Sequence, residues 1–284
     1  IQMLKVALPN KGSLADDALR LVSEAGYRCK RHGRELTVAD PDNNVEFFFL
    51  RPRDIPVYVQ GGIIDLGISG RDLALDSGTQ VEELLALGFG KSEFYYAVPA
   101  DRDITPDQFH NVRIATSYPG IVERDLRQRG VTGTTVRLDG AIEVSIRLGV
   151  ADVIADVVST GRTLKEAGLK VVGNPVLKSE AVLLARNNEI CERADCSAFL
   201  QRLQGIVVAR NYVVVEYDVP NNALASACDI TPGIESPTIA PLSENDWSAV
   251  KAMAHRKDIN RIMDELAAVG AKGIMITEIR TCRI

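Results

Sequence analysis

Residues 153–164 (VIADVVSTGRTL) contain the residue types from which a phosphate-binding loop is built. An apolar, strand-like run leads into Asp156, small and hydroxyl-bearing residues follow, and a helical pattern begins at Arg162. Small residues let the backbone approach a ligand closely, and successive amides at a helix N-terminus attract an anion. We expect these amides and hydroxyls to bind phosphate, and Asp156 to accept hydrogen bonds from a sugar. The alternative is an ordinary strand-to-helix turn with serine and threonine caps.

Other charged residues stand directly after predicted strands or at predicted helix starts. Lys11 follows a strand end, and Arg51 and Arg53 follow the buried run at 45–50. A cation beside amide groups suits a phosphate, and an arginine can bind one through two parallel hydrogen bonds. The alternative in each case is a solvated surface cation. Asp72 lies in the first turn of a predicted helix, where compensation of the helix dipole alone explains an acid.

A framework of alternating strands and helices must position these residues, and the N-terminal part of the chain predicts one. Apolar runs separated by helical patterns favour parallel strands and βαβ units, hence an α/β fold. Thr105 is expected to cap a helix that opens at Pro106. The predicted strands are 3–8, 45–50, 64–68, 94–98 and 112–116.

A weak internal repeat runs through this framework. Gly62-x-x-Asp65 leads through a strand to GRDL at 70–73, and Gly149-x-x-Asp152 leads through a longer turn to GRTL at 161–164. Chance recurrence of common strand-to-helix chemistry is one explanation, and duplication is the other. A duplication would give two similar α/β lobes facing a cleft.

The C-terminal segment has a different pattern. Residues 205–217 (GIVVARNYVVVEY) form a β-rich run, and further strands are expected at 236–240, 250–255 and 274–279. A short helix is expected at 221–228, and a second has its apolar face at 259–267. This order is close to βαββαβ, a ferredoxin-like unit.

The composition of the 284-residue chain excludes several functional classes. Its formal net charge is −5, whereas general nucleic-acid binders have a basic face, so we expect no nucleic-acid partner. No stretch of about 18 apolar residues and no signal-peptide pattern is present, so we expect no membrane association. The five cysteines are scattered and odd in number, which is typical of reduced thiols in a cytoplasmic protein.

Several long motifs in one order resemble a known family. Residues 153–164 resemble the phosphoribosyl-pyrophosphate loop of phosphoribosyltransferases, here with a single acid before the loop. The chain as a whole resembles the long form of the ATP phosphoribosyltransferase family, which catalyses the first step of histidine biosynthesis. The motifs are PNKGSL at 9–14, NNVEFFFLRPRDI at 43–55, DLGISGRDL at 65–73, LGFG at 87–90, RIATSYP at 113–119, DVVSTGRTL at 156–164 and TPGIESPTIAPL at 231–242.

The resemblance implies two periplasmic-binding-protein-like α/β lobes with the active site between them, plus a C-terminal ferredoxin-like (βαββαβ) regulatory domain. Residues 1–92 and 178–204 would form catalytic lobe I, and residues 93–177 lobe II with the phosphoribosyl-pyrophosphate loop. Residues 205–284 would form the histidine-binding domain. The short form lacks this domain and uses a separate regulatory partner, so no such partner is expected. The resemblance also implies a homo-oligomer, with dimers assembling into a hexamer.

The resemblance assigns roles to particular residues. Asp156 and Glu143 would be catalytic, each contacting sugar hydroxyls, and Tyr118 would stack on adenine unless it only packs in a turn. Phosphoribosyl pyrophosphate would bind at Asp156, Val157, Ser159, Thr160, Gly161, Arg162 and Thr163. The nucleotide would contact Lys11, Arg51, Asp72, Leu73, Ser92 and Tyr118. Regulatory histidine would bind at Asp218, Ser236, Thr238 and Gly273, and the ligands of a metal ion are not indicated.

The implied reaction transfers the phosphoribosyl group of phosphoribosyl pyrophosphate to N1 of ATP, with Mg²⁺ bridging the pyrophosphate and histidine as feedback inhibitor. Catalysis would then be mainly alignment and charge stabilisation. A rival hypothesis is a non-enzymatic two-lobe sensor of a small molecule such as an amino acid, which would not need a phosphate loop. A third is a phosphoribosyltransferase for another base, because the choice of adenine rests on the resemblance.

Overall fold

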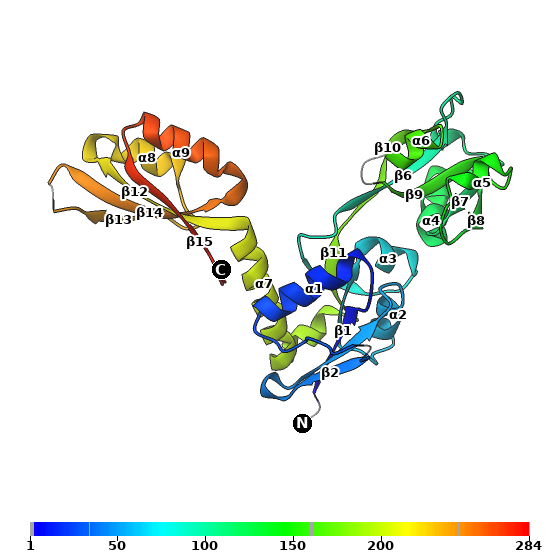
Figure 1. The fold of residues 1–284 in the computed structure, drawn as a ribbon, viewed down its shortest axis with the longest axis horizontal. Helices are drawn as coiled ribbons and strands as arrows, with labels where there is room; N and C mark the ends of the chain where they lie inside the picture. Colours follow the sequence, from blue (N-terminus) through cyan, green and yellow to red (C-terminus); the bar gives the residue numbers. More distant parts are fainter. Residues whose placement is uncertain (1–2, 34, 159–161, 244, 284) are drawn as a thin grey trace. The chain divides into compact units, whose positions relative to one another are not determined.

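The fold is known from a computed structural model that describes residues 3–33, 35–158, 162–243 and 245–283. The chain divides into two compact units, Ile1–Leu200 and Gln201–Ile284 (Figure 1). Within the described residues, no helix is both long and apolar enough to cross a membrane.

The first sheet of the N-terminal unit has six strands in the order β2-β3-β1-β4-β11-β5. Its central strand β1 pairs in parallel with β3 and β4, and its side chains are almost all buried. Continuous burial explains the unbroken apolar runs, since strands covered on both faces need no polar alternation. We call this sheet and its helices lobe I. Its elements are β1 (Leu4–Pro9), α1 (Ser13–Glu24), β2 (Thr37–Asp40), β3 (Val45–Leu50), α2 (Ile55–Gln60), β4 (Leu66–Gly70), α3 (Arg71–Asp76), β5 (Glu82–Ala86) and β11 (Ala181–Ala185).

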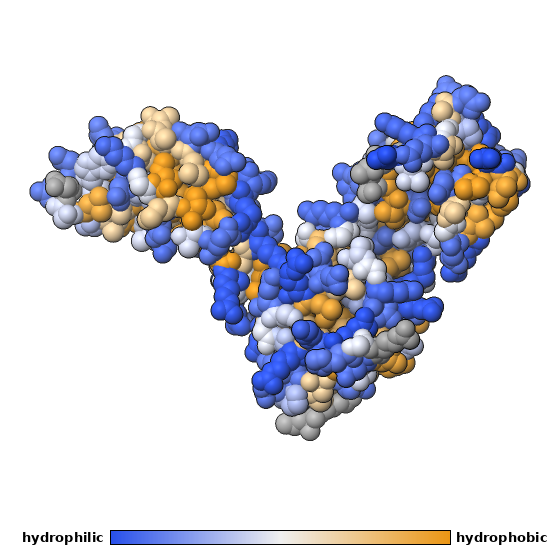
Figure 2. Space-filling view, in the orientation of Figure 1, coloured by the Kyte–Doolittle hydropathy of each residue, from blue (hydrophilic) through white to orange (hydrophobic). Residues whose placement is uncertain are grey.

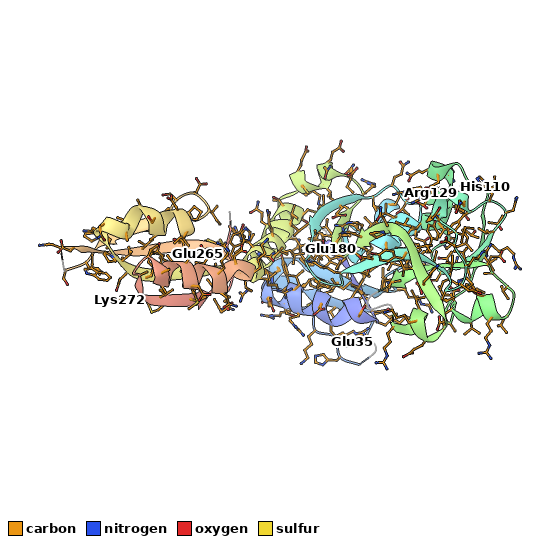
Figure 3. All side chains as sticks on the ribbon, turned by 90° about the horizontal axis from the view of Figure 1, so that it is seen from above. Glu35, His110, Arg129, Glu180, Glu265 and Lys272 are labelled. Atoms are coloured by element: carbon orange, nitrogen blue, oxygen red, sulfur yellow. The ribbon has the colours of Figure 1, made fainter. Side chains whose placement is uncertain are left out.

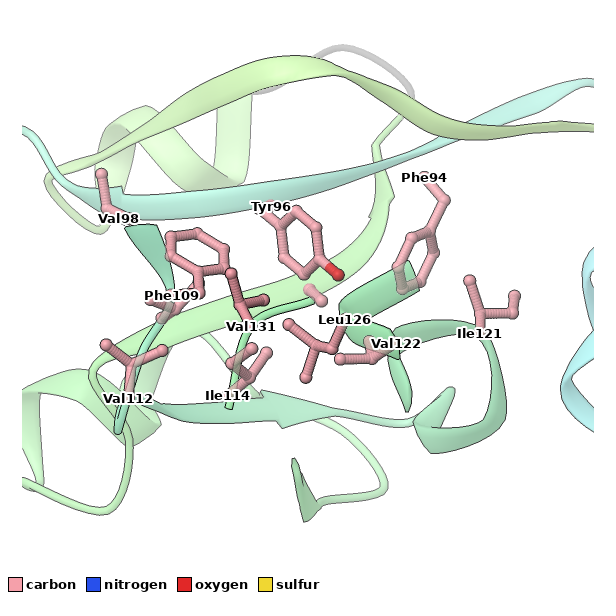
Figure 4. Close-up of a cluster of buried hydrophobic side chains, with 12 residues drawn as sticks. Phe94, Tyr96, Val98, Phe109, Val112, Ile114, Ile121, Val122, Leu126 and Val131 are labelled. Atoms are coloured by element: carbon pink, nitrogen blue, oxygen red, sulfur yellow. The ribbon is translucent and has the colours of Figure 1, made fainter. Parts of the chain in front are cut away.

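The second sheet has five strands in the order β10-β6-β9-β7-β8, and we call it and its helices lobe II. Aromatic and branched side chains fill the core between this sheet and α4, with Tyr96 and Phe109 in edge-to-face contact (Figure 4). Thr105 caps the short helix that opens at Pro106, as expected, and forms a capping box with Gln108. The elements are β6 (Ser92–Pro99), β7 (Arg113–Thr116), α4 (Pro119–Arg129), β8 (Thr134–Arg137), α5 (Val144–Arg147), β9 (Val153–Val158), α6 (Arg162–Glu166) and β10 (Leu169–Ser179).

The chain passes between the lobes twice, once between β5 and β6 and once between β10 and β11. β6 and β10 are antiparallel neighbours, and Ser92 pairs with Ser179 where both reach lobe I. The two crossings therefore lie side by side at the junction of the lobes.

The internal repeat occupies equivalent places in the two lobes. Asp65 precedes β4 and exchanges hydrogen bonds with Lys5: the Lys5 amide donates to the carboxylate at 2.9 Å, and the Asp65 amide donates to the Lys5 carbonyl at 3.0 Å. Asp152 precedes β9 and makes the same two bonds with Arg113, at 2.9 and 2.8 Å. The repeat glycine has a positive φ in both copies, 69° and 71°. Matching geometry on both sheets supports duplication over chance.

The C-terminal unit has the expected βαββαβ order, with sheet order β13-β14-β12-β15. The helices pack their apolar faces on one side of this sheet. The fold class expected from the sequence is thus confirmed, while the residue boundaries of the lobes stay a prediction. The elements are β12 (Tyr212–Pro220), α8 (Leu224–Ile230), β13 (Thr238–Pro241), β14 (Trp247–His255), α9 (Ile259–Ala268) and β15 (Lys272–Glu278).

One expectation for this region was wrong: residues 205–211 are not strand but the last part of α7 (Ala194–Asn211), and β12 begins at Tyr212. The segment is rich in β-branched residues, which favour strands locally. However, Phe199, Leu203 and Ile206 are spaced four and three residues apart, and all are buried. Burial of this helical stripe outweighs the local propensity.

Candidate functional site

Asp156, the expected catalytic acid, lies near the end of β9 and is half-buried. The amide of Val157 donates to Asp156 Oδ1 at 2.8 Å. Burial raises the pKa of Asp156, the hydrogen bond from Val157 lowers it, and the negative charge of Glu143 raises it. A half-desolvated carboxylate in this setting is suited to accept hydrogen bonds from sugar hydroxyls.

The expected phosphate loop follows directly. Val157 is the second-to-last residue of β9. Arg162 and Thr163 are the first two residues of α6, and both are exposed. Arg162 forms an ion pair with Glu166 one turn on, at 2.8 Å. The strand and helix that flank the loop are therefore present as expected, whereas Ser159, Thr160 and Gly161 lie outside the described residues.

Glu143 lies immediately before α5, and its negative charge acts on the pKa of Asp156. Ala141, two residues earlier, has a φ of 45° without being glycine. This left-handed conformation costs an alanine about 1–2 kcal/mol. Ile142 next to it is buried, so the turn is anchored from within. The two expected catalytic carboxylates thus lie on the same lobe, where the charge of Glu143 raises the pKa of Asp156.

Three residues expected to bind the nucleotide follow neighbouring strands of lobe I. Lys11 comes after β1, Arg51 after β3 and Asp72 after β4. β1 is parallel to both of the other strands, so the three positions share one edge of the sheet. Lys11 and Arg51 are exposed there. This is the edge at which open α/β sheets bind ligands.

Asp72 is the buried member of this set, with 8% of its surface exposed. Its backbone amide donates to Ser179 Oγ at 2.9 Å, and Ser179 Oγ donates to Asp72 Oδ1 at 2.9 Å. Leu73, the next residue of α3, is half-buried. The position of the Asp72 carboxylate thus depends on a residue from a distant part of the chain.

Tyr118 of lobe II lies close enough to Asp72 and Asp156 for their charges to affect its pKa. Burial raises the pKa of its phenol, and so do the negative charges of Asp72 and Asp156, while Arg53 lowers it. Arg53 Cζ lies 4.9 Å from the centre of the Tyr118 ring, and Phe94 meets the ring edge-on at 5.5 Å between centroids. An adenine ring would compete with the Arg53 guanidinium for that face of Tyr118.

Asp76, at the end of α3, joins the two lobes. Its Oδ2 accepts from Arg53 at 2.5 Å, and its Oδ1 accepts from the amides of Gly120 and Ile121 at 2.8 and 3.3 Å. These amides open α4, so a carboxylate of lobe I caps a helix of lobe II, where the dipole favours an anion. Only 6% of the Asp76 side chain is exposed. Arg53, Asp76 and Tyr118 therefore link the lobes beside Asp72.

Ser92 begins β6 and lines a pocket of about 460 Å³ where the two crossing strands meet. Seven of its eight lining residues are polar or charged, and one of them, Glu180, is labelled in Figure 3. Val158, the last described residue before the expected phosphate loop, belongs to the same wall. The lining residues are Arg71, Lys91, Ser92, Glu93, Val158, Lys178, Ser179 and Glu180.

The sequences of known proteins match the sequence of this chain over nearly its whole length. Residues 51–205 match the family described as ATP phosphoribosyltransferase, and residues 209–281 match the family described as HisG, C-terminal domain. The chain belongs to the ATP phosphoribosyltransferase family. An ATP phosphoribosyltransferase of Salinibacter ruber is 58% identical over 283 residues, covering 99% of this chain and 100% of the relative. One from Mycobacterium tuberculosis strain H37Rv is 53% identical over 285 residues, with the same coverage.

A solved structure agrees with the family assignment. A chain of the ATP phosphoribosyl transferase (HisG:HisZ) complex from Thermotoga maritima is 27% identical, with a TM-score of 0.63. The match covers 98% of that chain but 72% of this one. The chain is therefore an enzyme of the ATP phosphoribosyltransferase type, and it is longer than that relative.

The residues expected to bind histidine all lie in the C-terminal unit of this family member. Asp218 on β12 and Gly273 on β15 are close: a Cβ at Gly273 would lie 3.8 Å from Asp218 Oδ2. Thr238 on β13 pairs with Lys251, which pairs in turn with Glu216 of β12. Thr238 is thus two strands away from β12, and Ser236, just before β13, is exposed. The structure groups two of the four residues and holds the other two at the far side of the sheet.

A separate pocket of about 620 Å³ in the C-terminal unit has none of these four residues in its wall. It lies beside Tyr212 and His255, whose rings stack with centroids 4.3 Å apart. Glu265 of α9 contributes to this wall, and Figure 3 shows it on the helix, apart from Lys272 on β15. This pocket and the expected histidine-binding residues are therefore distinct features.

The sequence did not indicate Ser179 or Asp76. Ser179 contacts Asp72 across 107 residues, and Asp76 contacts Gly120 across 44. No local pattern marks either contact, because both depend on how β10 and α4 pack against α3. Arg53 was noted beside Arg51, but only the structure places it on Tyr118.

Proposed function

We propose that this enzyme transfers the phosphoribosyl group of phosphoribosyl pyrophosphate to N1 of ATP, giving phosphoribosyl-ATP and pyrophosphate, the first step of histidine biosynthesis. The full-length likeness to ATP phosphoribosyltransferases supports the proposal. The observation that carries it is the half-buried carboxylate of Asp156 near the end of β9, ahead of α6, with Glu143 on the same lobe and raising its pKa. A plain amino-acid sensor needs no such pair next to a loop of this kind.

The chemistry asks for alignment more than for covalent participation. The N1 lone pair forms the new bond to C1 of the ribose, while the bond from C1 to pyrophosphate breaks and its electron pair leaves with the pyrophosphate. Positive charge develops on the sugar ring during this exchange. Asp156 and Glu143 would hold the ribose hydroxyls and stabilise that charge. Loop amides and the start of α6 would hold the phosphates.

Mg²⁺ is part of the proposal. Among the described residues, no three acidic, histidine or cysteine side chains cluster closely enough to hold a metal ion. Mg²⁺ commonly binds through substrate phosphates and water rather than in an all-protein cage. We therefore propose that Mg²⁺ would bind largely through the pyrophosphate of the substrate and water, and would neutralise the charge of that pyrophosphate.

The proposal extends to regulation and assembly. Histidine would bind the C-terminal unit through Asp218, Gly273, Ser236 and Thr238 and inhibit the enzyme. Dimers would assemble into a hexamer without a separate regulatory subunit. Because both substrates are intracellular metabolites, the proposed location is the cytoplasm.

The deciding assay mixes the purified chain with ATP, phosphoribosyl pyrophosphate and Mg²⁺. We expect phosphoribosyl-ATP and pyrophosphate in equal amounts, measured by mass spectrometry and a coupled pyrophosphate assay. Replacing ATP by GTP should abolish product, which separates this reaction from transfer to another base. Ligand binding without product from either nucleotide would refute the proposal and favour a sensor.

A further inference from the structure

The N-terminus of α3 rests on the end of strand β10 and the residue after it. The Arg71 amide donates to the Glu180 carbonyl at 3.0 Å, and the Asp72 amide donates to Ser179 Oγ at 2.9 Å. The first amides of a helix have no partner inside the helix. At α3 the residue before the helix, Gly70, has no side chain to supply a cap. A serine 107 residues away therefore caps this helix.

The same serine also fixes a side chain. Ser179 Oγ accepts from the Asp72 amide and donates its own hydrogen to Asp72 Oδ1 at 2.9 Å. Ser179 is 6% exposed and Asp72 is 8% exposed, so water does not readily replace either bond. On the other side, a Cβ at Gly70 would lie only 2.2 Å from Asp72 Oδ1. The carboxylate oxygen is thus held between the serine hydroxyl and the backbone of Gly70.

We propose that Ser179 is a positioning residue, which acts through Asp72 to orient the nucleotide in the active site. This rests on the proposed function, in which Asp72 contacts ATP. Because Ser179 holds Oδ1, rotation of the Asp72 carboxylate is restricted, and the carboxylate would meet the nucleotide without reorganisation. Ser179 itself need not touch the substrate.

The location of Ser179 adds a second consequence. It is the last residue of β10, which crosses from lobe II into lobe I, and it pairs with Ser92 on the other crossing strand. A shift of β10 at Ser179 would therefore move the hydroxyl that holds Asp72. The nucleotide contact on lobe I is in this way coupled to the connection between the lobes.

The test compares Ser179→Thr with Ser179→Val, two side chains of nearly the same shape that differ by a hydroxyl. Loss of a hydrogen bond to a buried charged group costs about 1.5–3 kcal/mol, or ~10- to 100-fold in binding. We expect Ser179→Val to raise the KM for ATP by that factor while the KM for phosphoribosyl pyrophosphate stays within about twofold. Ser179→Thr should retain most of the wild-type affinity for ATP.

Two further variants separate positioning from folding. The first variant combines Ser179→Val with Asp72→Ala. Once the Asp72 carboxylate is gone, loss of the Ser179 hydroxyl should not change the KM for ATP any further. Ser248→Ala removes a buried hydroxyl that donates to Asn221 in the C-terminal unit, and it should leave both KM values unchanged. Equal losses in Ser179→Thr and Ser179→Val, or additive effects with Asp72→Ala, would overturn the proposal. A wild-type enzyme that makes no product would instead refute the proposed function.

Should Ser179→Val not fold, the comparison moves to binding. Wild-type, Ser179→Thr and Ser179→Cys are titrated with ATP by calorimetry after circular dichroism confirms folding. A thiol is a weaker hydrogen-bond donor than a hydroxyl. The affinity should then fall in the order Ser, Thr, Cys, and a cysteine variant that binds ATP as tightly as the wild type would exclude the positioning role.

Discussion

At the scale of single residues, Asp156 combines two influences that make its carboxylate costly to ionise. Burial raises its pKa, and the negative charge of Glu143 raises it further, with the Val157 amide opposing both. Between the ordinary pKa of an aspartate and this raised value, the folded state binds more protons than the unfolded state. Ionised Asp156 therefore lowers stability above that window, as expected of a group kept for function.

Asp156→Asn should consequently separate activity from stability. We expect kcat/KM to fall by about 10²-fold or more, since a group that stabilises the transition state is lost. The melting temperature at pH 7 should stay equal or rise, because the asparagine carries no buried charge. Steady-state kinetics and thermal melts between pH 4 and 8 check both parts. Wild-type turnover in this variant would remove Asp156 from the mechanism.

Glu143→Gln tests the coupling between the two carboxylates. Removing the negative charge of Glu143 lowers the pKa of Asp156, so Asp156 stays ionised to lower pH. The acid limb of the kcat/KM profile should shift to lower pH, whatever the change in maximal rate. Asp152→Asn, just before β9 and paired with Arg113, serves as the control and should not move that limb. A shift in the opposite direction would contradict the assigned interaction.

At the scale of elements, the apolar patterns predicted β9 and α6 around the loop and the strands β1, β3 and β4 of lobe I, but they did not predict β10, which carries Ser179. They failed at 205–211, where local β propensity and the helical spacing of buried residues disagree. Contacts between elements were beyond the sequence. Ser179 on Asp72, Arg53 on Tyr118 and Asp76 on α4 each join side chains far apart in the chain, so no local spacing encodes them.

The junction of α3 and α4 depends on the absence of a side chain at Gly120. A Cβ there would lie 2.3 Å from the Asp76 carbonyl oxygen, a backbone atom that cannot move alone. Gly120→Ala should therefore push α4 away and destabilise the fold by about 1–3 kcal/mol. Urea denaturation measures this, and Gln128→Ala on the exposed part of the same helix should change the free energy of unfolding by less than about 0.5 kcal/mol. Equal stability of the two variants would show that the close approach is unimportant.

At the scale of the whole molecule, the chain is two units with separate cores. On the face shown in Figure 2, each unit presents hydrophilic surface interrupted by patches of apolar side chains. The likeness to the Thermotoga maritima chain covers 72% of this chain, and residues 209–281 match a family of their own. A catalytic unit and an added sensing unit in one chain are consistent with this division, and they make the proposed histidine inhibition separable from catalysis.

A truncation tests that separation, and the structure decides where to cut. A chain ending near Gln204 would stop inside α7, which continues to Asn211 and buries Ile206. Residues 1–211 keep the helix whole. We expect this truncated enzyme to lose inhibition by histidine, measured as initial rates over a range of histidine concentrations. Because the removed domain would take part in the proposed assembly, the full-length variant Asp218→Ala is measured beside the truncated chain. It should lose sensitivity to histidine while keeping the wild-type mass in solution, because Asp218 would provide the carboxylate for the amino group of the ligand. If histidine inhibited the truncated chain as it inhibits the wild type, its site would have to lie in the catalytic unit.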